Sequence, residues 1–540
     1  MRFFLVAVFV CICGSVTTQA QSCLTPDDIK QVLARVDSAT PATVNTKLQA
    51  QLIKLATAER DALQQIVSED HPKESEKKTL TKLYDADTRK LCEILKTNGW
   101  PTTALVDREG VYATFYILRN STNLELQRAL FPVILAAVKK DPVQKPELAT
   151  LFDSLRISAG LKQIFGTQAV SREGFLVLYP IQDETKVDAL RAQFGLPDLE
   201  ANIRDLERTY GRPLIKARQP PSSYQSKQVT ESISKELDPT ALDPTYVAPS
   251  DVIKTDTNLV SLNVSVVDPK SKLFIGSLTK DDFKVVEDGQ QQTVTYFAST
   301  DVPFDLVLLI DLSGSTADKR DLIKISTLRF IEAARPTDRL AIVTFSDEPT
   351  VLCPLTLDRA QLKASVEKIE GMGDSNVWDA IKFTLDKVVG PKTLERRRAV
   401  LLMSDGVDSA LYRQGRAARG SKTTFADLVE EIRQNDTLIV PIYLDTEQVI
   451  GNPFDKTAYE NARRTLNLMA QESGGSYYKA RKLSDLNGVY QQVIDDLGKV
   501  YSLGYKPTNS ARDGTWRSVQ ISIVNRPDLV ARARPGYYAQ

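Results

Sequence analysis

Histidine is almost absent from this sequence, and that scarcity excludes several common kinds of site. The 540 residues include one histidine, His71, which lies in the polar segment 69–74. A histidine-rich zinc site needs more than one imidazole, and no histidine is left for a Ser-His-Asp triad elsewhere in the chain. Most common hydrolase chemistries therefore lose their usual general base. A glycine-rich nucleotide loop of the Walker type is also missing.

An excess of charge is missing too. Lys plus Arg number 69, Asp plus Glu number 69, and the sequence pI is about 6.7. A chain without net charge has no long-range attraction for nucleic acid or for an anionic membrane surface. We therefore expect neither as a partner.

Long apolar runs are absent apart from one near the N-terminus, which is too short to remain in a bilayer. Arg2 precedes the apolar residues 3–12, and Thr18-Gln19-Ala20 offers small residues for cleavage. This pattern predicts a secretory signal cleaved after Ala20, and therefore a secreted or periplasmic protein that is not an integral membrane protein. A lipoprotein signal ending at Cys23 fits less well, because Gln21-Ser22 lacks the usual small apolar lead-in.

Cysteines are few. Of the five, Cys11 and Cys13 would leave with the signal, so that Cys23, Cys92 and Cys353 remain. An oxidising compartment permits one bridge, and Cys23–Cys92 is the natural pair because both belong to the N-terminal region. Cys353 lies in an apolar strand pattern and is expected to be a buried free thiol. Three unpaired thiols are the alternative.

Composition divides the chain into regions after the predicted signal, residues 1–20. Residues 21–213 carry apolar residues at spacings of three and four, which predicts a mostly helical domain of unknown function. Residues 214–254, rich in Pro, Ser and Gln, predict a linker. Residues 255–300 and 501–540 contain alternating strand patterns, and neither segment has enough strands for a stable sheet. We therefore expect them to form one β-sandwich that residues 301–500 interrupt. The helices expected in the first domain are 27–36, 46–67, 74–97, 124–140 and 146–165, with a strand at 175–179.

Residues 301–500 alternate strands with helices, which is typical of a doubly wound sheet. Expected strands are 306–310, 340–345, 399–403 and 438–443, and expected helices are 319–334, 359–369, 377–388, 424–434 and 458–472. The predicted fold class is α/β: a doubly wound, mostly parallel sheet, inserted in a small β-sandwich and preceded by a mostly α-helical domain.

Oxygen-bearing side chains gather at one predicted edge of this sheet. Asp311, Ser313 and Ser315 follow directly after an apolar strand, Ser375 begins a later helix, and Asp405 ends another strand. The carboxyl ends of parallel strands meet at the same edge. One carboxylate and two hydroxyls from one tight loop are hard ligands that suit Mg²⁺. The alternative is that Asp311, Ser313 and Ser315 only cap the next helix.

These residues resemble the metal-ion-dependent adhesion site of von Willebrand factor type A domains, which combines Asp-x-Ser-x-Ser with a distant Thr and a distant Asp. The resemblance covers about 300–500, and within this range it includes residues 338–346 and 474–478. It implies that Ser313 and Ser315 bind the metal directly, and that Asp311, Ser375 and Asp405 bind it directly or through water. Ser375 departs from the usual Thr, and it lacks the methyl group that restricts the rotamer, which implies weaker metal affinity.

The resemblance also implies what such a site does. A bound Mg²⁺, or alternatively Mn²⁺ or Ca²⁺, keeps one position open for the Asp or Glu carboxylate of a protein ligand. A metal with few carboxylate ligands retains positive charge and attracts such a group. We therefore expect an extracytoplasmic protein-binding module for adhesion or assembly, and no enzyme. The nearby acids Asp347 and Asp408 are expected to be solvated loop residues.

Two further resemblances concern the flanking regions. Residues 278–283, 287–290 and 532–538 are similar to secreted von Willebrand A-related proteins that are numerous in soil acidobacteria. Residues 98–101, 160–168 and 180–196 are similar to an uncharacterised, mostly helical bacterial domain, over about 50–205. Relatives of that domain tend to carry histidines at positions matching 119–123, where this chain has none. For Trp100 and Gln168 we expect core packing and helix capping rather than a ligand pocket.

Two other functions remain open at this point. The N-terminal domain could be an enzyme of unknown reaction that the C-terminal module targets, and a cleft within 50–205 lined by Glu or Asp residues with perturbed pKa values would favour this. The C-terminal module could instead be a metal-free structural protein of the cell envelope. A Ser375 side chain that points away from Asp311 would favour that second alternative.

Overall fold

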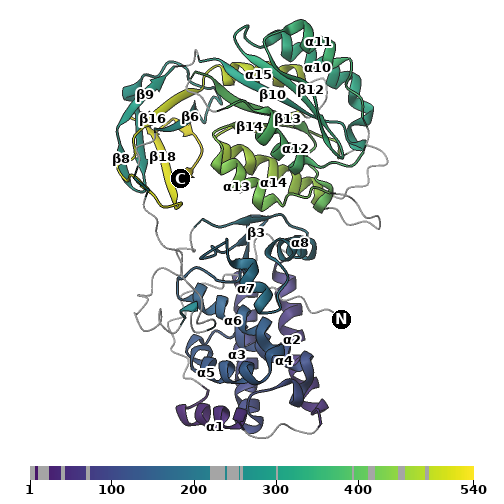
Figure 1. Ribbon diagram of the computed structural model, residues 1–540, viewed down its shortest axis with the longest axis vertical. Helices are drawn as coiled ribbons and strands as arrows, with labels where there is room; N and C mark the ends of the chain where they lie inside the picture. Colours follow the sequence, from purple (N-terminus) through teal and green to yellow (C-terminus); the bar gives the residue numbers. More distant parts are fainter. Residues whose placement is uncertain are drawn as a thin grey trace. The chain divides into compact units, whose positions relative to one another are not determined.

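The computed structural model separates the chain into two compact units, Met1–Pro249 and Ser250–Gln540 (Figure 1). The division falls inside the predicted linker, and the finer domain boundaries stay predictions. His71 and the predicted cleavage site at Ala20 lie outside the described residues. The structure describes residues 7–9, 23–37, 43–67, 73–218, 237–239, 242, 254–255, 259–299, 302–371, 373–391, 395–411, 420–447, 456–480 and 486–539.

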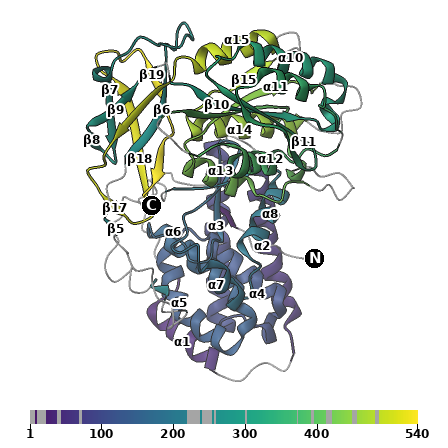
Figure 2. The same ribbon diagram turned by 45° about the horizontal axis from the view of Figure 1, so that its top comes forward.

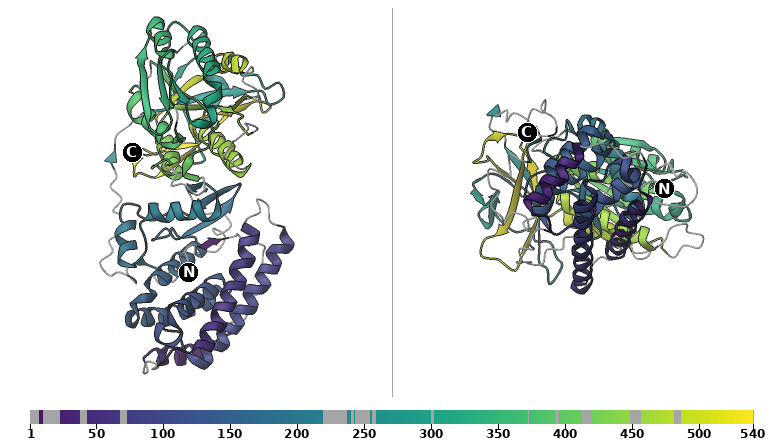
Figure 3. Two further views of the ribbon diagram at one scale, coloured as in Figure 1. Left: turned by 90° about the vertical axis from the view of Figure 1, so that its right-hand side faces the viewer. Right: turned by 90° about the horizontal axis from the view of Figure 1, so that it is seen from below.

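The first unit is mostly helical, as predicted. The long helices α2 and α3 lie side by side (Figure 3), and the other helices pack a continuous apolar core with them. Within the described part of this and the other unit, no helix is both long and apolar enough to cross a membrane. The helices are α1 (Pro26–Asp37), α2 (Thr46–Val67), α3 (Glu74–Asn98), α4 (Thr103–Asn120), α5 (Leu124–Lys140), η1 (Pro142–Gln144) and α6 (Lys145–Ser158).

Helix α4 was not among the predicted helices, and its surroundings explain why. Val106, Val111 and Ile117 are buried on it, but so are Gly110 and Thr114, which leaves the second half of the helix without a solvent face. A helix that is buried on all sides shows no alternation of apolar and polar residues at helical spacing. The spacing of apolar residues that predicted the other helices therefore could not predict α4.

Helix α6 ends at Ser158, and the prediction that it continues to residue 165 is wrong. The buried carboxylate of Asp153 accepts hydrogen bonds from the backbone N–H groups of Ile164, Phe165 and Thr167, at 2.7 to 3.2 Å. These donors would be used inside a continuing helix. Asp153 thus folds the following segment back against its own helix.

A small sheet follows, in the order β1-β2-β3-β4. It consists of β1 (Ala7–Phe9), β2 (Gln168–Arg172), β3 (Phe175–Leu178) and β4 (Leu214–Lys216), with α7 (Val187–Gln193) and α8 (Leu199–Tyr210) before the last strand. The strand expected at 175–179 is confirmed as β3. Strand β1 lies within the predicted signal, so cleavage after Ala20 would remove it, and β4 lies at the start of the predicted linker.

Three sequence expectations concern side chains of this unit. Cys23 and Cys92 form a disulfide that links the segment before α1 to α3. Trp100 is buried and donates a hydrogen bond to Gln144 at 3.0 Å, and it packs edge-on against Phe115. Gln168 is fully buried and donates to the carbonyl of Thr150 at 3.0 Å. Both residues therefore belong to the core.

The second unit begins and ends with strands that share one β-sandwich. One sheet has the order β19-β6-β16-β9 and the other β20-β18-β7-β8, so that both combine strands from before and after the α/β part. The strands are β6 (Val260–Val267), β7 (Phe283–Glu287), β8 (Gln290–Gln292), β9 (Val294–Ala298), β16 (Tyr501–Tyr505), β18 (Trp516–Ile523), β19 (Val530–Arg532) and β20 (Gly536–Tyr538). The predicted split sandwich is confirmed. Two short strands, β5 (Lys254–Thr255) and β17 (Ala511–Arg512), pair antiparallel in a separate two-stranded sheet.

A six-stranded sheet forms the α/β part, in the order β12-β11-β10-β13-β14-β15, with only β12 antiparallel. The strands are β10 (Phe304–Asp311), β11 (Arg339–Phe345), β12 (Pro349–Thr356), β13 (Arg397–Ser404), β14 (Leu438–Leu444) and β15 (Tyr478–Ala480). Cys353 on β12 is buried and free, as expected.

Helices cover both faces of this sheet (Figure 2), which confirms the doubly wound prediction. One face packs against α10 (Arg320–Ala333), α11 (Arg359–Val366) and α15 (Leu486–Leu497). The other face lies against α12 (Val377–Phe383), continued by η6 (Thr384–Val388), and against α13 (Phe425–Gln434) and α14 (Lys456–Ser473). The central strand β10 is buried along its whole length.

Opening the disulfide should destabilise the first unit. Cys23→Ser removes a cross-link across 69 residues, and we expect the free energy of unfolding to fall by about 4 kcal/mol, because the unfolded chain gains loop entropy. Denaturant unfolding can be followed by the fluorescence of Trp100 alone in a Trp378→Phe, Trp516→Phe background. Dithiothreitol should lower the free energy of unfolding of the parent protein to that of the variant, and it should leave the free energy of unfolding of the variant unchanged. An equal response of both proteins to the reductant would contradict the prediction.

Candidate metal centre

Asp311 is the last residue of β10, and its carboxylate is the centre of a hydrogen-bond cluster. It is fully buried. Its Oδ1 accepts from the N–H of Ser313 at 2.9 Å, and its Oδ2 accepts from the hydroxyls of Ser404 at 2.5 Å and Ser375 at 3.3 Å. Three separate segments of the chain thus meet on one carboxylate.

The loop after β10 brings two hydroxyls together. The Oγ atoms of Ser313 and Ser315 lie 3.2 Å apart. Thr316 fixes the loop, because its hydroxyl donates to the carbonyls of Asp311 and Ser313, both at 3.0 Å. A turn of 3₁₀ helix, η5 (Gly314–Lys319), follows before α10. The capping alternative has no direct support here, since no side chain caps η5 at Ser313.

Ser375 stands just before α12 and is buried. Its N–H donates to the hydroxyl of Ser409 at 3.1 Å, and its carbonyl accepts from the N–H of Ser409 at 2.9 Å. The Ser375 hydroxyl donates to Asp311, so it does not point away from the other candidate ligands. This geometry disfavours the metal-free alternative.

Asp405 follows β13 directly and is fully buried. Its Oδ1 accepts from the N–H of Val407 at 3.2 Å, and its Oδ2 accepts from the hydroxyl of Thr446 at 2.9 Å. Gly406 turns the chain with a φ of +73°, and a Cβ there would lie 2.6 Å from Leu466 Cδ1. Glycine is therefore required directly after Asp405.

The two carboxylates interact electrostatically. Burial and the negative charge of Asp405 together raise the pKa of Asp311 to about 6. Two buried like charges disfavour each other's ionisation. A cation between them would relieve this repulsion, so the electrostatics of the cluster suit a positive ligand.

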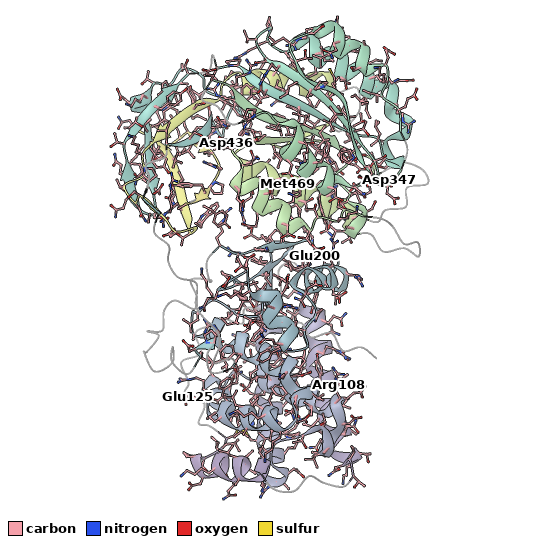
Figure 4. The ribbon with its side chains drawn as sticks, in the orientation of Figure 1. Arg108, Glu125, Glu200, Asp347, Asp436 and Met469 are labelled. Carbon is pink, nitrogen blue, oxygen red and sulfur yellow. A yellow bond between two sulfur atoms is a disulfide. The ribbon has the colours of Figure 1, made fainter. Side chains whose placement is uncertain are left out.

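Of the two nearby acids, one lies as predicted and one does not. Asp347 is exposed in the loop after β11 (Figure 4) and accepts from the N–H of Asp374 at 3.1 Å. Asp408 is buried, so the expectation of a solvated residue is wrong. It accepts from the N–H groups of Trp378, Ala410 and Ser421 and from the Ser421 hydroxyl, at 2.6 to 3.2 Å. It ties the loop after β13 to the start of α12.

The donor set can be compared with what a metal needs. Among the residues that the structure describes, no group of three or more His, Cys, Asp or Glu side chains has the arrangement of a metal site. Instead, the cluster combines the carboxylates of Asp311 and Asp405 with the hydroxyls of Ser313, Ser315 and Ser375. Oxygen donors of this kind fit Mg²⁺, Mn²⁺ or Ca²⁺ better than a metal that prefers nitrogen or sulfur.

Two residues of the cluster were not predicted. Ser404 donates to Asp311, and Thr446, which also shares a hydrogen bond of 2.9 Å with the hydroxyl of Tyr459, donates to Asp405. Ser404 ends β13 and Thr446 follows β14, at the same sheet edge as Asp311. The carboxyl ends of parallel strands meet at one sheet edge, and this rule, which predicted Asp311 and Asp405, could also have predicted these two residues.

Comparison with protein families gives two matches. Residues 306–407 match the von Willebrand factor type A domain, and residues 46–215 match a family of unknown function, DUF6624. The second unit therefore contains a von Willebrand factor type A domain. Domains of this class generally serve protein interaction or adhesion and are not enzymes. The narrower resemblance to acidobacterial secreted proteins stays a prediction.

Several solved structures are similar at low identity. An aerotolerance-related membrane protein from Bacteroides fragilis matches at 13% identity and a TM-score of 0.28, over 36% of this chain and 99% of that one. The von Willebrand domain of a type V pili tip protein from Porphyromonas gingivalis matches at 14% and 0.28, over 36% and 94%. A mussel byssus thread matrix protein with a zinc-occupied adhesion motif matches at 17% and 0.26, over 36% and 48%. At these TM-scores the likenesses do not define a function.

Removing the Asp408 carboxylate should destabilise the second unit. Asp408→Ala leaves four donors without their acceptor, and we expect a loss of about 3 kcal/mol in the free energy of unfolding. In a Trp100→Phe background, Trp378 and Trp516 report on this unit. The matched control is Asp347→Ala, an exposed acid, which should cost less than about 1 kcal/mol. Equal losses of free energy of unfolding in the two variants would show that the buried hydrogen bonds of Asp408 do not stabilise the unit.

Proposed function

We propose that the second unit is a divalent-cation-dependent binding module for proteins, used in adhesion or assembly. The observation that carries this proposal is the convergence of Asp311, Ser313, Ser315 and Ser375 in one hydrogen-bonded cluster. In our proposal, Ser313 and Ser315 hold the cation directly, while Asp311, Ser375 and Asp405 hold it directly or through water. The cation supplies a Lewis-acidic position for an anionic group of a partner.

The partner that we propose presents an Asp or Glu side chain. The cluster contains two carboxylates, and a divalent ion held by three neutral hydroxyls and these two groups would keep an affinity for further anionic oxygen. A carboxylate is the anionic group that a protein surface offers most often. In this proposal the metal joins two proteins, and no covalent bond is made or broken. Such a role needs no general base, and the sequence has no histidine between residues 300 and 500.

We further propose that the module acts outside the cytoplasm. The predicted secretory signal, residues 1–20, supports this location, and so does the Cys23–Cys92 disulfide, since disulfides form and persist in oxidising compartments.

Addition of Mg²⁺ or Mn²⁺ to metal-stripped protein should stabilise the second unit. A cation at one hundred times its dissociation constant contributes roughly 2.7 kcal/mol, which corresponds to a rise of about 5–10 °C in the thermal midpoint. Asp311→Ala should abolish the rise, because the central carboxylate is lost. The Trp100→Phe background again limits the fluorescence signal to this unit.

The matched control for this experiment is Glu332→Gln. Glu332 is an exposed acid on α10 that pairs with Lys363 at 2.7 Å, away from the cluster, so its removal should leave the cation effect unchanged. A parent protein that shows no cation effect would exclude the metal site. If the cation effect is present, an acidic peptide or protein ligand should bind with the cation and be released by EDTA.

A further inference from the structure

The first unit contains a second cluster of polar side chains, buried among its helices. Its members come from elements far apart in the sequence but close in the fold, and all are at most 6% exposed. They are Glu59 on α2, Tyr84 and Asp87 on α3, Tyr116 and Arg119 on α4, and Glu147 on α6.

Four of these residues have buried atoms without a hydrogen-bond partner among the described residues. The atoms are Glu59 Oε1, Asp87 Oδ2, Arg119 Nε and Glu147 Oε2. Buried polar groups in folded proteins nearly always have partners, and each exception needs an explanation. Several exceptions in one cluster indicate that something other than this chain completes the bonding.

Arg119 is the least satisfied member. Its guanidinium lies 5.0 Å from the centre of the Tyr116 ring, but within the described part of the chain it has neither an ion pair nor a side-chain hydrogen bond. Its charge nevertheless acts on Glu59, Tyr84, Tyr116 and Glu147, so the guanidinium lies near these four side chains. A buried guanidinium without a counterion is costly.

The nearby carboxyl groups do not supply the missing charge. Burial raises the pKa of Glu59 well above its usual range, which favours the neutral form, and the side chain accepts from the amide of Asn120 at 3.0 Å. Asp87 pairs with Lys90 at 2.9 Å. Burial raises the pKa of Glu147 to about 6 and the charge of Arg119 opposes this rise, but no ion pair between the two side chains is found among the described residues. Arg119 therefore has no paired anion among the described side chains.

Tyrosine hydroxyls provide suitable neighbours for that anion. Tyr84, Tyr112, Tyr116 and Tyr210 all lie within the electrostatic influence of Arg119, and burial raises the pKa of each. Their hydroxyls therefore remain protonated. A guanidinium binds carboxylate or phosphate oxygens through two parallel hydrogen bonds, and protonated hydroxyls can donate further bonds to the same oxygens.

We propose that Arg119 anchors a binding site in the first unit for a small ligand that carries an oxyanion, either a carboxylate or a phosphate. This site is separate from the metal cluster and does not depend on the function proposed for the second unit. A divalent cation between Glu59 and Asp87 is the competing occupant, but the positive charge of Arg119 opposes it. Ordered water alone would satisfy the carboxyl groups and leave the guanidinium charge unbalanced.

Binding of inorganic phosphate and of acetate to the full chain tests this proposal, with calorimetry at constant ionic strength and chloride as the reference anion. We expect one of the two oxyanions to bind, and Arg119→Gln to weaken that binding at least tenfold. Tighter phosphate binding identifies a phosphoryl ligand, and tighter acetate binding a carboxylate ligand. The matched control is Arg204→Gln, which removes a more exposed arginine of α8 that pairs with Glu200 at 2.7 Å and should change the affinity less than twofold.

A second variant keeps the test decisive if Arg119→Gln does not fold. Glu147→Gln removes a negative charge that competes with the anion, so the affinity at pH 7 should rise severalfold. The groups that influence the Glu147 carboxyl are Arg108, Arg119 and Asp141, besides Tyr112. No oxyanion binding by the parent, unchanged affinity in a folded Arg119→Gln protein, or equal or weaker binding by Glu147→Gln would each overturn the proposal.

Discussion

The carboxylate of Asp311 is the constraint on which the candidate metal centre depends. It ends a strand that is buried along its length, and it receives hydrogen bonds from the following loop, from the segment before α12 and from the end of β13. The parallel pairing of β10 with β13 brings these groups to one edge. Without an acceptor at this position, Ser375 and Ser404 would each lose the bond that orients its hydroxyl.

The buried acids of this protein have two kinds of surroundings. Asp153 and Asp408 are as deeply buried as Glu59, but each accepts several hydrogen bonds from backbone groups and a nearby hydroxyl. Such a carboxylate holds loops in place and has little capacity left for a ligand. Glu59 and Glu147 keep oxygens without partners. In the first unit, oxygens without partners therefore distinguish Glu59 and Glu147 from the structural acid Asp153.

Much of the fold could be predicted because apolar periodicity and turn residues are local signals. Strand β10 and helix α2 are examples in which the sequence pattern and the structure nearly coincide. Where the prediction failed, a contact between distant segments decided the structure. Helix α4 has neighbours on all sides, and α6 ends because Asp153 captures the next amides. The surroundings of Arg119 could not be predicted from the sequence, since its neighbours come from four helices; in the sequence, the segment 119–123 is notable only for the histidines that it lacks.

The serine at position 375 can be reconsidered from its contacts. From sequence alone, Ser in place of Thr implies a freer rotamer, because the methyl group that restricts it is missing. In the fold, hydrogen bonds replace part of that restriction: Ser409 binds the backbone of Ser375 in both directions, and Asp311 accepts from its hydroxyl. The rotamer is thus held by polar contacts that depend on the loop after β13. Any loss of metal affinity relative to Thr should consequently be smaller than the missing methyl group suggests, and it should grow if the loop anchored by Asp408 is loosened.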